Sequence, residues 1–590
     1  MLVTACVWTS LLAIAVALWT VRAQWSRFWF ELEDPRSMAA FRIALTLVAI
    51  ANVAGLWPWH AMLLSSEGIL DGAEAARTFA PGSFAPGLLE RAWAIVTGPV
   101  SLLYLFDGPA ALGLHLAVFG LSALAFLVGW RTRAAGIVMF FAMDGLLVRN
   151  FLFWEGTEIV IRVFTAYLVC ARCGHAYGVD AWRYRRDHPE KPRYRPIPAW
   201  PRRLAIVQLA VLLGTTGLLK TGDAWLDGDA IYYALHSQHY ARFVGAPSWS
   251  LGLLRVVTWV ARTIEALFPL VLVGVVGRWA RAHGERLEPR ARRIVIVCTG
   301  ITVVATTVVV ATTGQPRLLP VGTPAGATVV WLGLCLGTGW VVYRPDAPRW
   351  ARWPYRRGPW LVAAAALMSG MWLSMNIGWF HPAVLACLIP LLEGEEVGRI
   401  VQRLTGRGGG AGPSTSRLAY GPRGRRLVGG LLAVHLMALA LVVIPSSVHP
   451  PALRAAIEPV LGAWLRATRT QQSWGMWAPE PRMDDPMLRV VVVDADGVPR
   501  DLGTDLYALR RPVLGYDRRW KINGRILSTG ASGPYARPFA RWHCRQWAEG
   551  HAPARRVELY QLDWAIPPPT SSQAALVVAR PEPFLSEPCG

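Results

Sequence analysis

Only three lysines, Lys191, Lys220 and Lys521, occur among the sixty basic residues of this 590-residue chain. Lys220 closes an apolar helix and is followed by the turn residues Thr-Gly-Asp of segment 221–223. Arginine stays protonated in proteins, whereas a desolvated lysine can lose its proton and act as a base. A lysine in a chain that otherwise favours arginine therefore predicts chemistry that arginine cannot do. The alternative is a cation that snorkels to the surface at a membrane boundary.

Charged and aromatic residues near other apolar segments are further candidates for a binding site. Glu158 and Arg162 are four residues apart, so they share a helical face, where they form either an ion pair or a polar ligand site. Arg42 lies inside another apolar segment and needs a buried partner or a ligand headgroup. Trp474 and Met476 follow the last apolar segment, and they either line a substrate groove or pack the tail onto the membrane helices.

The histidines and cysteines do not predict a metal site. His236 and His239 share a helical face, but a metal would need a third ligand. Cys170 and Cys173 form a CxxC pair, with His175 two residues beyond it. A c-type haem site requires the histidine directly after the second cysteine, and zinc requires further ligands. We therefore expect no bound metal.

Composition and apolar periodicity indicate an all-α polytopic membrane bundle. Hydrophobic residues make up 53% of the chain, charged residues 17%, and the mean hydropathy is +0.33. About twelve apolar stretches approach the roughly 20 residues that cross a hydrocarbon core. They are 1–21, 38–57, 108–129, 134–148, 157–171, 204–220, 253–277, 294–313, 326–343, 359–376, 381–392 and 427–445.

The net charge of +22 is distributed as in a membrane protein. Arginines crowd the loops 172–203, 278–293, 344–358 and 399–426, which all fall on one side if the helices alternate. By the positive-inside rule these loops are cytoplasmic, both termini lie outside, and a bacterial-type plasma membrane is expected. No phosphate-binding loop or nucleic-acid module accompanies the charge, so we expect the lipid bilayer and no nucleic acid as partner.

Three regions follow from this topology. Residues 1–27 form an N-terminal helix, which we expect to be retained because no basic residue precedes it while Arg22 and Arg27 follow its apolar run. Residues 28–445 form the multi-helix membrane domain, with Gly406–Ser416 as a flexible loop.

Residues 446–590 are predicted to form an extracytoplasmic α+β or mostly-β domain. It would be entered through the proline-rich stretch 445–451. The apolar run Met487–Val493, followed by a turn at Asp494–Gly497, predicts a strand. Cys544 and Cys589 could form a disulfide there, although spacing alone does not show proximity.

Four stretches carry motifs in a fixed order along most of residues 28–500. The run Arg203–Leu235 contains an apolar helix, then Gly217-Leu-Leu-Lys220, Trp225 and Gly228, and then Ala230-Ile-Tyr-Tyr. The others are Phe41-Arg42-Ile43 after Glu33-Asp34-Pro35-Arg36, Tyr177-Gly-Val-Asp180, and Gln472-Ser-Trp474-Gly-Met476-Trp477-Ala-Pro479. In order and spacing they resemble the HTTM domain family, which is related to the vitamin K-dependent gamma-carboxylases.

This resemblance implies a mechanism. In the carboxylases a lysine matching Lys220 deprotonates reduced vitamin K, the anion reacts with oxygen, and the resulting alkoxide removes a gamma-proton from a glutamate of a protein substrate. Carbon dioxide then adds to the carbanion, and vitamin K leaves as its epoxide. The resemblance therefore implies reduced vitamin K or another quinol as cofactor and a quinone or a peptide as substrate.

Two functional hypotheses follow. The first is a hydroquinone-dependent epoxidase or carboxylase-like membrane enzyme with Lys220 as base. The second is a non-catalytic membrane protein on the same scaffold, with a role in lipid or peptide binding, transport or biogenesis. It is motivated by the segment Trp154–Glu158, which lacks the histidine that the carboxylases carry near the start of the corresponding helix.

Overall fold

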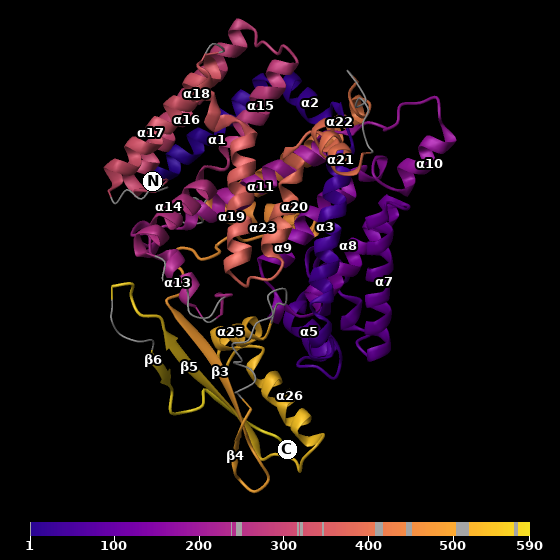
Figure 1. Cartoon of the computed structure of the whole chain (residues 1–590), viewed down its shortest axis with the longest axis vertical. Coiled ribbons are helices and arrows are strands. Elements are labelled where there is room, and N and C mark those ends of the chain that lie inside the picture. Colours follow the sequence, from indigo (N-terminus) through magenta and orange to yellow (C-terminus); the bar gives the residue numbers. More distant parts are fainter. Residues whose placement is uncertain are drawn as a thin grey trace.

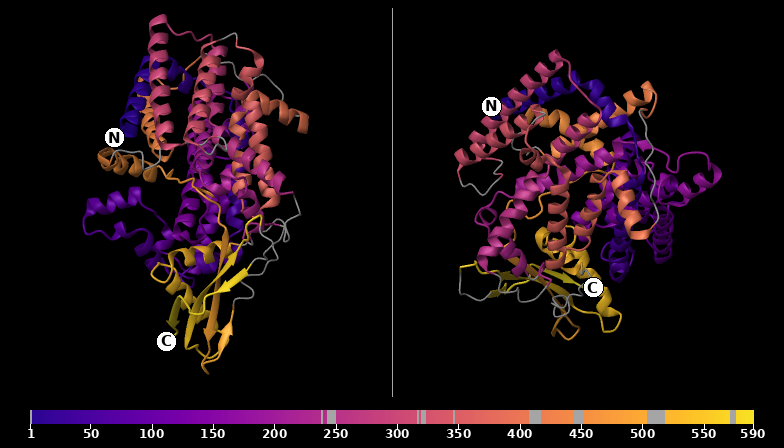
Figure 2. Two further views of the ribbon diagram at one scale, coloured as in Figure 1. Left: turned by 90° about the vertical axis from the view of Figure 1, so that its left-hand side faces the viewer. Right: turned by 45° about the horizontal axis from the view of Figure 1, so that its top comes forward.

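The computed structural model describes residues 2–237, 239–242, 250–315, 318, 323–344, 347–406, 417–443, 451–502, 518–570 and 576–590. Most of these residues form a bundle of helices, and the C-terminal part forms a mixed helix and sheet unit at one end of it (Figures 1 and 2). The bundle is expected for apolar runs, because a helix satisfies its own backbone polar groups without water.

The helices follow the apolar stretches closely. The N-terminal half contains α1 (Leu2–Thr20), α2 (Arg22–Phe30), α3 (Arg36–Ala54), α4 (His60–Leu64), α5 (Gly72–Phe79), α6 (Leu88–Thr97), α7 (Pro109–Val128), α8 (Thr132–Arg149), α9 (Gly156–Cys170), α10 (Val179–Asp187), α11 (Trp200–Leu219), α12 (Asp223–Leu226) and α13 (Ala230–His236). The remainder of the bundle contains α14 (Leu251–Leu267), α15 (Leu270–Ala282), α16 (Pro289–Thr313), α17 (Pro324–Tyr343), α18 (Arg349–Arg352), α19 (Arg357–Ser374), α20 (Phe380–Cys387), α21 (Gly394–Thr405), α22 (Pro422–Val443) and α23 (Pro451–Ala467).

Fewer helices than predicted are long and apolar enough to cross a membrane. Within the described residues there are seven, or up to eight if α14 and α15, which meet at a bend of 44°, count as one span. All twelve predicted stretches are helical, but α20 spans only eight residues and α8 and α9 carry charged side chains that are buried inside the bundle. The structure therefore supports a helical membrane protein and does not support a count of about twelve spans.

The C-terminal unit is built on an antiparallel sheet. Its strands are β3 (Asp484–Val493), β4 (Pro499–Asp501), β5 (Arg556–Ala565), β6 (Leu576–Ala579) and β7 (Leu585–Pro588). They lie in the order β4-β3-β5-β6, with β7 also paired to β5. Helices α25 (Arg519–Thr529) and α26 (Ala536–Ala548) pack against this sheet (Figure 1).

Two sequence predictions for this unit are confirmed. The apolar run Met487–Val493 lies in β3, and the turn after it closes with Gly497 at a φ of +86°, a conformation that favours glycine. Cys544 on α26 and Cys589 after β7 form a disulfide, with their Cα atoms 5.4 Å apart.

The predicted C-terminal region, 446–590, is divided in the structure. Its first helix, α23, packs against the bundle helices α22 and α6, and Leu461 and Leu465 are buried in the main apolar cluster. The sheet unit begins only at β3. Residues 407–416 and 444–450, which include most of the predicted flexible loop and proline-rich stretch, lie outside the described residues.

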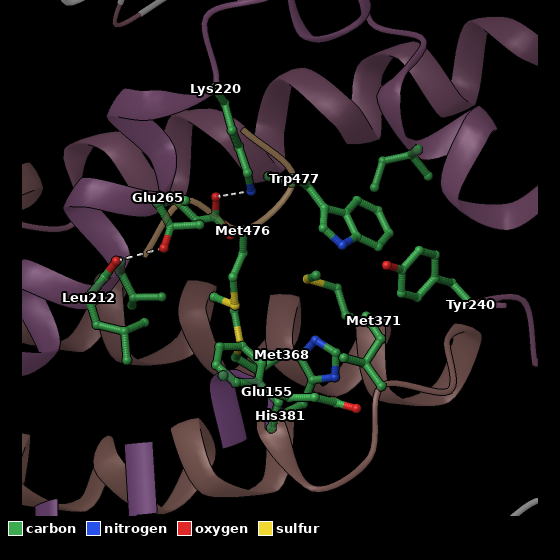
Figure 3. A pocket seen from close by; sticks show the side chains of 18 of the residues that line it. Glu155, Leu212, Lys220, Tyr240, Glu265, Met368, Met371, His381, Met476 and Trp477 are labelled. Carbon is green, nitrogen blue, oxygen red and sulfur yellow. Dashed lines mark hydrogen bonds and ion pairs between the residues drawn. The ribbon is translucent and has the colours of Figure 1, made fainter. Parts of the chain in front are cut away.

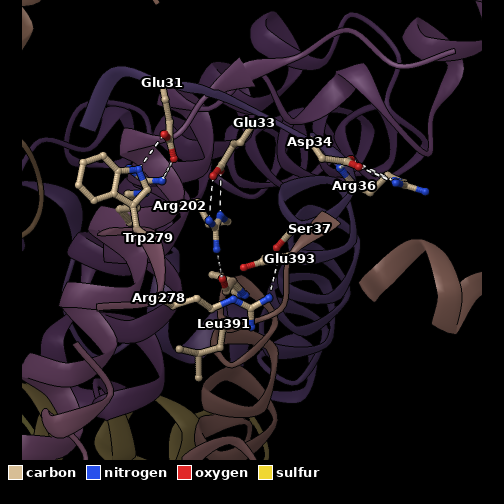
Figure 4. A network of polar contacts seen from close by, with 12 residues as sticks. Glu31, Glu33, Asp34, Arg36, Ser37, Arg202, Arg278, Trp279, Leu391 and Glu393 are labelled. Carbon is tan, nitrogen blue, oxygen red and sulfur yellow. Dashed lines mark hydrogen bonds and ion pairs between the residues drawn. The ribbon is translucent and has the colours of Figure 1, made fainter. Parts of the chain in front are cut away.

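A network of arginines and carboxylates holds the bundle together at the α2–α3 end (Figure 4). Glu33, in the two-residue strand β1 (Leu32–Glu33) that pairs with β2 (Ile197–Pro198), accepts two hydrogen bonds of 2.8 Å from Arg202 at the start of α11. Arg36 pairs with Asp34 at 2.6 Å. The motif Glu33-Asp34-Pro35-Arg36 therefore has a structural role, one helix length away from Lys220.

Candidate functional site

Lys220 is the residue directly after α11, and it forms a buried ion pair with Glu265 on α14. The two helices approach closely at Gly217, where an added Cβ would lie 2.3 Å from the backbone nitrogen of Ala266. A side chain at position 217 would therefore separate the helices. Because Gly217 has no side chain, α11 can approach α14 closely enough for the ammonium group of Lys220 to reach the Glu265 carboxylate.

Other contacts fix Lys220 within the protein. Its ammonium nitrogen lies 4.4 Å from the centre of the Trp225 ring, in a cation–π contact, and its backbone carbonyl accepts a 2.8 Å hydrogen bond from Arg262. Lys220 is only 4% exposed. This burial contradicts the alternative of a cation that snorkels to the surface, because such a side chain would place its charge in water.

The Lys220–Glu265 pair forms part of the wall of a cavity of about 420 Å³ (Figure 3). Its polar lining consists of Glu155, Thr216, Lys220, Tyr240, Glu265, His381, Ser473 and Lys521. Its apolar lining consists of Leu212, Leu213, Trp225, Ile231, Ala261, Met368, Met371, Ile377, Phe380, Met476, Trp477 and Trp520. A cavity of this size and composition fits a flat aromatic ligand with a few polar substituents.

The segment after α23 closes the cavity beside Lys220. The Trp477 carbonyl accepts a 2.8 Å hydrogen bond from the Trp225 indole, and the Pro479 carbonyl accepts one of 3.0 Å from the Gly222 amide. Met476 lines the cavity, as the groove hypothesis requires. Trp474 is 1% exposed and donates a 2.5 Å hydrogen bond to Gln472, so it packs the segment and does not line the cavity.

Of the two alternatives for Glu158 and Arg162, the ion pair between them is not formed. Glu158 pairs instead with Arg518, before α25, at 2.9 Å. Arg162 lies 3.9 Å from Asp144 on α8 and donates a 2.8 Å hydrogen bond to the Gln471 carbonyl. Neither residue lines the cavity, because each is drawn to a partner on another element.

Arg42 is also remote from the cavity. It is fully buried and donates hydrogen bonds to the carbonyls of Cys173 at 3.0 Å and Tyr177 at 2.6 Å. We predicted a buried partner or a ligand headgroup for Arg42, and the structure shows that its partners are these backbone carbonyl groups. In the described part of the chain, no three His, Cys, Asp or Glu side chains are grouped as metal ligands.

The structure adds seven polar residues that we did not single out for this site. Four of them are Glu265, Glu155, His381 and Lys521, and the other three carry hydroxyl groups: Thr216, Tyr240 and Ser473. Glu265 is the only carboxylate in the apolar stretch 253–277, which is the signal that could have revealed it, since such a charge needs a partner. His381 begins another predicted apolar stretch. It supplies a histidine to the cavity from α20, whereas the segment that begins α9 has none.

Burial controls the protonation of two of these groups. Glu155 precedes α9, and burial raises its pKa to about 7, with a further increase from Glu158 that is opposed by Lys521. Burial lowers the pKa of Lys521 on α25, whereas the attraction of Glu155 opposes that shift. Glu155 is therefore less strongly charged near neutral pH than it would be in water.

No protein-family model, curated protein or solved structure matches this chain. The geometry and chemistry of the cavity therefore carry the functional argument.

Proposed function

We propose that this protein is an integral membrane enzyme that acts on a reduced quinone, with Lys220 as the base and Glu265 as its proton partner. The observation that carries the proposal is the position of the Lys220 ammonium group, which is buried against a carboxylate at a mainly apolar cavity. Membership of the HTTM family, an epoxidase or carboxylase-like reaction and a peptide as second substrate are parts of the same proposal.

The lining residues meet the main requirements of this chemistry. Aromatic and methionine side chains can hold a flat ring while excluding water, which strengthens electrostatic interactions inside the site. A bound quinol would supply a hydroxyl proton and two reducing equivalents. Lys220 can accept that proton only as an amine. In apolar surroundings, transfer of a proton from Lys220 to Glu265 makes that amine form accessible.

Substitution of the two partners tests the proposal. Lys220→Arg and Glu265→Gln in purified protein should each lower hydroquinone-dependent oxygen uptake by at least about 100-fold, since positioned acid–base groups contribute on that order. Lys191→Arg, which changes an exposed lysine, is the matched control and should retain full turnover. Normal turnover by the Lys220→Arg variant at wild-type expression would refute the role of Lys220 as base.

The ion pair itself supports a second candidate function. A carboxylate next to Lys220 stabilises the ammonium form and so opposes its action as a base. In that case the cavity would bind a lipid or peptide group without turnover, as expected for a transport or biogenesis protein. Saturable ligand binding without any oxygen uptake would favour this function over the enzyme.

We further propose that the arginine-rich loops face the cytoplasm and that the C-terminal sheet unit lies outside. The charge distribution supports this orientation. In a background that retains only Cys544 and Cys589, Gly550→Cys should react with an impermeant maleimide in intact cells, whereas Lys191→Cys should react only after permeabilisation. The reverse labelling pattern would contradict the orientation.

A further inference from the structure

His381 is a buried histidine without a hydrogen-bond partner among the described residues. It lies in the first turn of α20, is 0% exposed and lines the cavity. Neither Nδ1 nor Nε2 has a partner in that part of the chain. Leaving a buried polar atom without a hydrogen bond is unfavourable, so packing alone does not explain a histidine here.

Glu155, which also lines the cavity, has a second buried polar atom without a hydrogen-bond partner among the described residues. Its side chain caps α9 by accepting a hydrogen bond from the backbone amide of Glu158, while its Oε1 atom is buried without a partner among the described groups. Gly156 follows it, and an added Cβ there would lie 3.0 Å from the Phe380 ring. The start of α9 is therefore packed against the start of α20, which brings Glu155 towards His381.

A third polar residue of this part of the site, Lys521, comes from the C-terminal unit. Lys521 on α25 lines the cavity, and its ammonium nitrogen lies 5.3 Å from the centre of the Trp520 ring. Glu155 lines the same cavity, and its negative charge opposes the lowering of the pKa of Lys521 by burial. The three residues together offer a donor, an acceptor and a histidine that can do either.

Glu155 and His381 lie across the cavity from the Lys220–Glu265 pair. Figure 3 shows Lys220 and Glu265 on one side, Glu155 and His381 on the other, and the side chains of Met371 and Met476 between them. The Lys220–Glu265 pair forms one polar end of the cavity, and Glu155 with His381 forms a second polar end; Tyr240 also lines the cavity. A ligand with one polar group would leave one end unsatisfied.

We propose that Glu155, His381 and Lys521 bind the second ring oxygen of an aromatic ligand whose first oxygen contacts Lys220. This inference rests on the proposed function and deepens it, because it specifies a para-quinone or para-hydroquinone over a simple phenol. The hydroxyl form can donate to Glu155 or His381, and the carbonyl form can accept from Lys521. The three residues position the ring and take no part in proton removal at Lys220.

Binding of two probe ligands tests this second polar end. The cavity contains Trp225, Trp477 and Trp520, so quenching of tryptophan fluorescence under anaerobic conditions reports binding to full-length protein in lipid nanodiscs. The probes are 2-methyl-1,4-naphthohydroquinone and 2-methyl-1-naphthol, which lacks the second oxygen. Wild-type protein should bind the diol about tenfold or more tightly than the naphthol. The hydrogen bonds to the second oxygen are buried, and their loss lowers affinity by about that factor.

Three substitutions remove the second polar end without touching Lys220. His381→Phe, Glu155→Gln and Lys521→Met should weaken binding of the diol, leave binding of the naphthol nearly unchanged, and so reduce the preference between them. His435→Phe is the matched control, because His435 is buried away from the cavity and bonded to Tyr167 at 2.8 Å. If the His381→Phe variant does not accumulate, the binding of the diol and the naphthol is compared in Lys521→Met, which lies on the C-terminal unit.

The outcomes separate this inference from the proposed function. An unchanged preference in His381→Phe and Lys521→Met, or equal binding of the two probes by wild-type protein, would overturn the second polar end while leaving a quinone enzyme intact. Failure of wild-type protein to bind either probe would overturn both. Loss of the diol preference together with retained naphthol binding would support the inference.

Discussion

Buried charges in this protein fall into two classes at the residue scale. Arg162 and Glu158 have partners on other elements, and such pairs are costly to break but do no chemistry by themselves. Lys220 and Glu265 are also paired, but they form part of the wall of a cavity. His381 lines that cavity with no partner for its ring nitrogens among the described residues. The candidate site is thus distinguished by the cavity and by unsatisfied groups, and charge alone does not identify it.

Glu155 predicts a specific dependence of stability on pH. Its pKa is raised from 4.5 to about 7 by burial, so folding takes up a proton between these pH values. The unfolded chain binds fewer protons in this window, and the contribution of Glu155 to stability therefore falls as pH rises from about 5 to about 7. Over that range the melting temperature of the wild type should decline relative to that of Glu155→Gln.

Thermal unfolding in nanodiscs across this pH range is the measurement. Glu90→Gln, at an exposed position on α6, should follow the wild-type profile. A difference between wild type and Glu155→Gln that does not change with pH would show that Glu155 does not titrate in this window.

At the scale of elements, the close packing of α11 on α14 creates the site. Gly214 and Gly217 lie on the same face of α11, and an added Cβ at Gly214 would lie 2.5 Å from the Pro269 ring. Helices with small residues at their interface approach closely, as is common in membranes. This approach lets a side chain at the end of one helix reach a carboxylate within the next.

Gly217→Ala should separate α11 from α14. Its Cβ would meet backbone atoms of residues 265 and 266, which have no flexible side chain to move aside. Overpacking of this kind costs about 1–3 kcal/mol, and we also expect loss of the Lys220–Glu265 contact and of hydroquinone turnover. The measurements are thermal unfolding and oxygen uptake.

Gly300→Ala on α16 is the matched control for this substitution. Its added Cβ would meet no atom within 4 Å, so alanine should be neutral or slightly stabilising in this helix. Wild-type turnover by Gly217→Ala would show that the close approach is not needed for the site.

At the scale of the whole molecule, the C-terminal unit completes the cavity. Trp520 and Lys521 on α25 contribute to its wall, and the segment 473–477 forms another part. Arg518 fixes α25 to the bundle through Glu158 at 2.9 Å and Asn52 at 2.7 Å. The site therefore depends on docking between two parts of the chain that are more than 300 residues apart in sequence.

Arg518→Met should loosen this docking. It leaves Glu158, which is fully buried, without its cationic partner, and breaking a buried pair costs about 3–5 kcal/mol. Hydrogen exchange should increase in both segments 153–162 and 518–529. Arg537→Met, at an exposed position on α26, is the control and should leave both segments protected. Unchanged exchange in Arg518→Met would contradict the role of Arg518 in docking.

The local pattern of residues predicted the helical elements and the most prominent candidate. Apolar runs specified the helices, because a chain in hydrocarbon must satisfy its backbone internally. The apolar run Met487–Val493 and the turn that follows it specified a strand. Lys220 was recognisable because the chain has only three lysines and this one lies at the end of an apolar helix. The count of about twelve spans stays a prediction beyond the seven or eight long apolar helices, because apolar character alone does not show whether a helix crosses a membrane or packs inside the bundle.

The partners of these residues required the tertiary structure. Glu158 and Arg162 have the spacing of an ion pair, yet each bonds to an element distant in sequence, since buried charges adopt the partners that packing brings closest. For the same reason the sequence identified Lys220 but not Glu265 as its partner, and gave no sign that α20 and α25 deliver His381 and Lys521 to one cavity. Residue type is local in the sequence, whereas a cavity is formed by residues that only long-range packing brings together.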